Sequence, residues 1–93
     1  MDVVDQLHVR IHGLVQGVGF RYAALHEAFP LQLTGWVRNV PGGAVEAVFE
    51  GERKALERML RWCEDGPPYA RVDHIEATWS QGKRRYDRFR IQT

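Results

Sequence analysis

The sequence has only one cysteine, Cys63, which excludes an internal disulfide bond. It contains no run of apolar residues that approaches the ~18 needed for a membrane-spanning helix. The first six residues, MDVVDQ, include two acids and no basic residue, so they do not match a secretory signal peptide. These absences predict a protein that folds by packing alone, does not enter a membrane, and resides in the reducing cytoplasm.

Neither sign of charge is in clear excess. The chain has 13 lysines and arginines against 12 acids, which gives a net charge of +1. The strongly basic balance that favours nucleic acid or an anionic membrane surface is therefore missing, and neither partner is expected. With 93 residues the chain can bury one hydrophobic core, so we expect a single domain over residues 1–93.

Hydrophobic periodicity predicts five strands and two helices. Alternating apolar residues, or β-branched and aromatic ones, mark the expected strands at 6–12, 33–39, 44–50, 71–79 and 86–92. Apolar residues recur every three or four positions after Phe20 and again over 55–63, and these helices are expected to end at Pro30 and at the DGPP stretch. The polar stretch SQGKRR, residues 80–85, predicts a turn before the last strand.

This order of elements is βαββαβ with a short fifth strand. One apolar stripe on each helix would cover one face of an antiparallel sheet and leave the other face wet. We therefore predict an α+β fold, the ferredoxin-like or split βαβ sandwich, with two helices on one face of the sheet. A crossover helix between the first two strands requires them to be parallel, so their carboxyl ends are expected at the same edge.

The stretch GLVQGVGFRY, residues 13–22, places three glycines and then an arginine between the first strand and the first helix. Glycines allow successive main-chain N–H groups to face an anion, and the helix start adds further unpaired N–H groups. Arg21 adds a guanidinium that matches phosphate oxygens, although a solvated arginine after a plain glycine turn fits the same spacing. The glycines match neither GxxxxGK[ST] nor GxGxxG, so nucleotide binding is not expected.

Arg38 and Asn39 end the second expected strand at the edge where the glycine loop leaves the first. An asparagine before a glycine-containing turn is usually a turn former, and position alone favours that role; the alternative is that its amide holds a water or a substrate oxygen. Its expected proximity to Arg21 favours the second role. Arg38 is expected to be an exposed strand arginine, with contact to a substrate carboxylate as the alternative.

Several motifs together resemble the acylphosphatase family over nearly the whole chain. They are GLVQGVGFR at 13–21, LTGWVRN at 33–39, GGAVEAVFEG at 42–51, GPPYARVDHIE at 66–76 and the closing FRIQT. The resemblance implies a ferredoxin-like fold and hydrolysis of acyl phosphates to carboxylate and orthophosphate. It also implies that Arg21 binds the phosphate, that Asn39 positions the water, and that the main chain of Val15, Gln16, Gly17, Val18 and Gly19 forms the phosphate cradle.

The chemistry of an acyl phosphate fits a site with so few groups. The leaving carboxylate has a conjugate acid with a pKa of ~4, so its departure needs no general acid. Main-chain N–H groups and Arg21 can stabilise the charge on the transferred phosphoryl group without a metal. We therefore expect no cofactor, no partner beyond acyl phosphate and inorganic phosphate, a monomer, and little activity on phosphate monoesters, whose alkoxide leaves poorly.

Three positions depart from the family pattern. Leu14 stands where the family often has a basic or polar residue, and Gln32 replaces a common glycine before the second strand. The stretch VPGG, residues 40–43, stands where an aspartate-glycine turn is usual. None of these changes alters Arg21 or Asn39, so we expect them to affect substrate preference and turn stability.

The main alternative function is a domain that binds phosphate or carbamoyl phosphate without catalysis. A similar domain begins the hydrogenase-maturation proteins, but those chains continue into cysteine-rich zinc motifs, whereas this sequence ends at Thr93, which favours the free enzyme. RNA-binding modules share the topology and carry stacking aromatics on the third strand. Here the face of the third strand that would contact RNA carries Glu46 and Glu50, and their negative charge is unfavourable for RNA binding.

Metal and thiol chemistry are not expected. His8 and His12 share a strand face but are too far apart to bind one ion, and His26 and His74 have no partner at a ligand spacing. Cys63 lies on the apolar face of the second helix and is expected in the core, where a thiol is inert.

Overall fold

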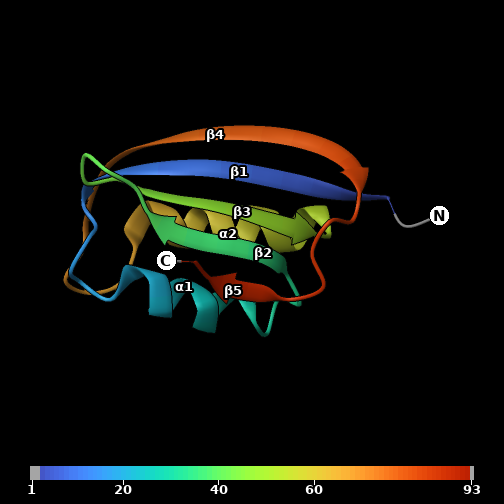
Figure 1. Ribbon diagram of the computed structural model, residues 1–93, viewed down its shortest axis with the longest axis horizontal. Coiled ribbons are helices and arrows are strands. Elements are labelled where there is room, and N and C mark those ends of the chain that lie inside the picture. The colour runs from blue at the N-terminus through green and yellow to red at the C-terminus, as the bar shows by residue number, and fades with distance from the viewer. Residues whose placement is uncertain (1–2, 93) are drawn as a thin grey trace.

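The computed structural model describes residues 3–92, so residues 1–2 and 93 of the expected domain lie outside it. Its elements are β1 (Val3–Leu14), α1 (Phe20–Ala28), β2 (Thr34–Asn39), β3 (Val45–Gly51), α2 (Arg53–Asp65), β4 (Arg71–Lys83) and β5 (Phe89–Ile91) (Figure 1). The strands form one sheet in the order β4-β1-β3-β2-β5. The predicted ferredoxin-like α+β fold is confirmed. No helix within the described residues is long and apolar enough to cross a membrane.

Strand β3 lies between β1 and β2 and runs antiparallel to both, which makes β1 and β2 parallel as predicted. Ile11 and Asn39 both pair with Val45, so the end of β2 lies level with the last part of β1. The short strand β5 pairs with β2 in parallel, which makes the sheet mixed at this end. The predicted common edge for the glycine loop and the end of β2 is therefore present.

The turn predicted at residues 80–85 is wrong for its first four residues. Strand β4 continues to Lys83 because β1 begins at Val3, earlier than expected, and offers a pairing partner for this polar segment. Side chains reinforce the pairing, since Gln81 Nε2 donates to Asp5 Oδ1 at 2.7 Å. The polar residues of this segment indicated a turn, but pairing with β1 along the outer edge of the sheet makes residues 80–83 a strand.

The core lies between the sheet and the two helices. Its fully buried side chains come from the predicted inward positions, among them Leu7, Val9, Ile11, Ala47, Phe49, Ala24, Leu56 and Met59. Phe20, the first residue of α1, packs edge-on against Trp62 of α2 with ring centroids 5.3 Å apart. Cys63 is buried as predicted, and its desolvation, with the charge of Glu64, raises the pKa of the thiol far above its ordinary value.

Glu50 is a completely buried carboxylate on the sheet face opposite the helices. Its Oε2 accepts hydrogen bonds from Gln6 Nε2 at 2.7 Å and from the main-chain N–H of Arg85 at 2.9 Å. Its Oε1 accepts from Thr34 Oγ1 at 3.0 Å and from the main-chain N–H of Tyr86 at 3.1 Å. This face is thus not uniformly wet, because Glu50 holds part of the β4–β5 connection against it.

We predict that Glu50→Ala destabilises the protein by about 3 kcal/mol, because four donors that converge on this buried carboxylate lose their acceptor at once. Urea unfolding followed by circular dichroism measures the change, with Glu52→Ala, an exposed position, as the control. A loss below about 1 kcal/mol would show that water replaces the carboxylate at little cost.

Candidate active site

The loop at residues 15–19, predicted to form an anion cradle, joins β1 to α1 and contains two glycines in the left-handed backbone region. Gly17 and Gly19 adopt left-handed φ angles of 76° and 80°, which residues with a side chain adopt only at a cost. A Cβ added at either glycine would contact nothing within 4 Å, so conformation and not space requires glycine there. Gly19 is also the N-cap of α1, so the loop runs directly into the helix N-terminus.

Arg21 lies in the first turn of α1 and is partly buried. Within residues 3–92 its guanidinium makes no hydrogen bond or ion pair, and the first turn contains no acidic residue. A cation next to a helix N-terminus gains nothing from the helix dipole, which favours anions there. The helix start and Arg21 therefore form a positive centre that has no internal counter-charge in the described residues.

Asn39 is the last residue of β2 and lies on the face of the sheet that carries the helices. It alternates with the fully buried Val37, whereas Arg38 points to the opposite, open face. Helix α1 packs against β2 on this side. The Asn39 amide has no hydrogen-bond partner in the described part of the chain. The bonds of the turn that follows are made by other groups, such as Val40 N–H to the Ala44 carbonyl at 3.0 Å.

Gln16 connects the loop directly to this turn. Its Nε2 donates to the main-chain carbonyls of Val40 and Ala44, both at 2.8 Å. Both amide hydrogens are thereby used, so Gln16 can contribute only its main-chain N–H to a bound anion. Sequence analysis placed Gln16 in the cradle but missed this link. The only signal was a two-donor side chain in a loop otherwise made of glycine and valine.

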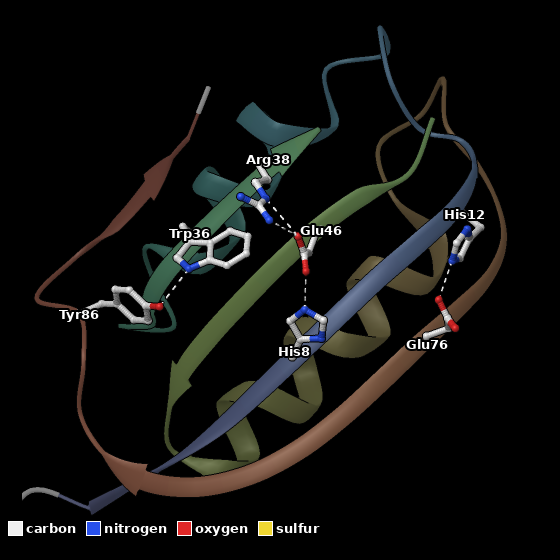
Figure 2. A network of polar contacts seen from close by, with 7 residues as sticks. All are labelled: His8, His12, Trp36, Arg38, Glu46, Glu76 and Tyr86. Atoms are coloured by element: carbon white, nitrogen blue, oxygen red, sulfur yellow. Dashed lines mark hydrogen bonds and ion pairs between the residues drawn. The ribbon is translucent and has the colours of Figure 1, made fainter. Parts of the chain in front are cut away.

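A polar network covers the open face of the sheet, starting from Glu46 of β3 (Figure 2). Arg38 donates twice to Glu46 Oε1, from Nε at 3.0 Å and from Nη2 at 2.7 Å. His8 Nε2 donates to Oε2 at 2.7 Å. The Arg38 guanidinium lies 4.9 Å from the centre of the Trp36 ring, whose Nε1 donates to the Tyr86 hydroxyl at 3.1 Å. Arg38 is exposed as expected, but it is committed to this network.

The two glutamates that sequence analysis placed on an exposed face are in fact buried. Glu46 and Glu50 retain 8% and 0% of their accessible surface, because donors from neighbouring segments surround them. Burial of Glu46 acts to raise its pKa, but the hydrogen bonds and positive charges of His8 and Arg38 outweigh it and leave the pKa below its ordinary value.

Histidines distant in sequence meet on the outer strands. His12 and His74 face each other across β1 and β4 with stacked rings 4.3 Å apart, and His12 Nε2 lies 2.8 Å from Glu76 Oε1. The stacking of His74 on His12 was not predicted, because cross-strand register is not visible in local spacing. No group of three or more histidine, cysteine, aspartate or glutamate side chains among the described residues is arranged to hold a metal.

Glu46 predicts a specific acid dependence of stability. Its folded-state pKa is below the unfolded value, so its contribution is present above the unfolded pKa and is lost as pH falls through the folded pKa. We expect the free energy of unfolding to fall less steeply with decreasing pH in Glu46→Gln than in the parent protein. Urea unfolding between neutral and strongly acidic pH measures this slope. A slope in Glu46→Gln as steep as that of the parent would contradict the assignment to Glu46.

Known proteins are similar to this chain in sequence and in fold. The acylphosphatase family model matches residues 7–91. An acylphosphatase of Burkholderia lata is 45% identical over 89 residues, which are 96% of this chain and 91% of that protein. One from Trichormus variabilis is 53% identical over 76 residues, or 82% and 75% of the two chains. The crystal structure of the Bacillus subtilis acylphosphatase superposes with a TM-score of 0.92 at 37% identity and covers 96% of this chain and 99% of that chain. The chain therefore belongs to the acylphosphatase family.

Proposed function

We propose that this protein hydrolyses acyl phosphates, the reaction of its family, with Arg21 and the main chain of residues 15–19 binding the phosphoryl group and Asn39 orienting the attacking water. The observation that carries these roles is the placement of two polar groups without partners in the described chain. The guanidinium of Arg21 stands at the helix start that ends the cradle, and the Asn39 amide ends a strand on the same side of the sheet.

The proposed binding step uses fixed main-chain dipoles and one side chain. Charge on the equatorial phosphoryl oxygens grows in a loose transition state, and preorganised N–H groups and a guanidinium stabilise it. The φ angles of Gly17 and Gly19 support this role, because they let the chain turn around a bound anion. The backbone of Val15 and Val18 completes the cradle, with the Val15 side chain anchored in the core.

The proposed chemical step needs neither a metal nor a strong base. A water held by the Asn39 amide attacks phosphorus as the bond to the acyl oxygen breaks, and the carboxylate leaves with the electron pair. A neutral amide cannot take the proton, so an oxygen of the phosphoryl group accepts it, and inorganic phosphate is the second product. A monoester would have to expel an alkoxide, and none of these groups provides a proton for it.

The working form that we propose is a single-domain monomer over residues 1–93 that acts in the cytoplasm without a cofactor. Burial of Cys63 supports the cytoplasmic part, because the fold uses its only thiol as a packing residue and not as a disulfide. The proposed partners are small molecules, an acyl phosphate and inorganic phosphate, and nucleic acid is not an expected partner.

We predict that Arg21→Ala lowers kcat/KM for benzoyl phosphate by about 10²–10³-fold, as for loss of other anion-hole donors. The assay contains a chelator, and loss of the anhydride is followed against buffer alone. Folding stability is expected to stay the same or rise slightly, because the change removes a cation from a helix N-terminus. Arg61→Ala, at an exposed position on α2, is the control. Full activity in Arg21→Ala would eliminate the proposed phosphate site.

For Asn39→Ala we expect a different pattern, because this residue is assigned to water and not to phosphate. Turnover should fall by about 10²-fold, since the attacking water is no longer aligned. The inhibition constant of inorganic phosphate should change less than about twofold, because the cradle remains intact. The assignment is wrong if the variant keeps its kcat and loses phosphate affinity.

A further inference from the structure

Asn39 lies between two side-chain clamps that originate outside its own strand. We propose that Gln16 and Glu46 are positioning residues for acyl phosphate hydrolysis, which fix the main chain on either side of Asn39 so that its amide meets the phosphoryl group held by the loop. This inference rests on the roles proposed above for Arg21 and Asn39, and it identifies what holds them in register.

The end of β2 needs such support because its pairing there is one-sided. Its outer neighbour β5 pairs with β2 only as far as Val37, opposite Ile91, and Gln92 N–H adds a last bond to the Val37 carbonyl. Within the described residues, Arg38 and Asn39 pair with β3 alone. A strand end with one partner and an unbonded terminal side chain would fray more readily than the rest of the sheet.

The first clamp acts just after Asn39. The two carbonyls that accept from Gln16, those of Val40 and Ala44, come from the two sides of the β2–β3 turn. The turn is also closed by its own bond between these residues, so Gln16 holds it as one unit. Because Gln16 belongs to the cradle itself, a shift of the turn would shift the cradle with it. One amide thus connects the phosphate-binding half of the site to the water-binding half.

The second clamp acts just before Asn39, on the open face shown in Figure 2. Arg38 stands directly opposite Glu46 in the register and donates two hydrogen bonds to one of its oxygens. The other oxygen accepts from His8 of β1, the strand that leads into the loop. The Glu46 side chain is only 11% exposed, whereas those of Arg38 and His8 are each 44% exposed, so the carboxylate is shielded from water and its directional charge-assisted bonds fix the geometry. This clamp also connects the loop side to the end of β2.

The test is a set of double-mutant cycles with Asn39. Gln16→Met and Glu46→Ala are made in the parent and in Asn39→Ala, and kcat, KM and phosphate inhibition are measured with benzoyl phosphate. Each clamp variant should lower kcat about tenfold in the parent, with KM and phosphate inhibition changed less than about twofold. In Asn39→Ala the same changes should lower kcat less than about twofold, because there is no amide left to misplace.

Two matched variants control for the loss of a side chain of the same kind elsewhere. Gln81→Met removes an amide that bonds Asp5 on the outer strand pair, and Glu76→Ala removes a carboxylate that bonds His12. Both should keep the parent kcat. Urea unfolding of every variant confirms that the assays are done on folded protein. If Gln16→Met does not fold, Gln16→Asn, which keeps the donors on a side chain one carbon shorter, takes its place.

Two results would overturn the positioning roles: an unchanged kcat in the clamp variants, or an equal loss of kcat in the parent and Asn39→Ala backgrounds, as a general structural defect would give. Failure of the proposed function looks different. In that case the parent protein leaves benzoyl phosphate intact, or Asn39→Ala alone retains the parent kcat, whatever the clamp variants do.

Discussion

The register of β3 is the constraint on which the rest of the structure depends. This strand is central, and all of its residues except Val48 are buried. Its helix-facing side chains are apolar, whereas Glu46 and Glu50 face the other way and need hydrogen-bond donors from both neighbouring strands. A slip of one residue would place both carboxylates in the core and leave them without these donors. The register of β3, which places Asn39 of β2 level with Ile11 of β1, is therefore strongly specified.

Local periodicity was enough to predict the helices, the strands and their buried faces. Features that depend on side-chain contacts between strands could not be predicted from the sequence. Alternation over β1 and the helical spacing around Cys63 identified the faces that form the core, because burial and period are directly linked. The topology that followed was enough to bring the glycine loop and Asn39 to one edge. The extension of β4 to Lys83, the burial of Glu46 and the stacking of His12 on His74 each require knowing the partner residue across a strand pair. The roles of Arg21 and Asn39 remain predictions, since their placement agrees with those roles but does not test them.

The candidate site contains features that are unfavourable for stability by themselves. Arg21 places a positive charge at a helix N-terminus without an acid in the first turn, and the loop uses glycines that lose much conformational freedom on folding. The Asn39 amide leaves its hydrogen-bonding capacity unused within the described chain. In the proposed function all three serve to bind a phosphoryl group and a water, which would supply the missing partners. Stability elsewhere in the fold, such as the packing of Phe20 on Trp62, therefore has to hold this arrangement in place.

Hydrophobic packing and polar contacts have separate tasks in holding the site. The core fixes which face of each strand points to the helices, but apolar contacts are not directional and do not define where a strand end lies to within the distance that in-line attack requires. Directional bonds from Gln16 and Glu46 act on the residues next to Asn39, where the apolar contacts of β2 end. The open face of the sheet, though remote from substrate, is on this view part of the catalytic architecture. Through Glu46 it connects β1, which leads into the glycine loop, with β2, which ends at Asn39.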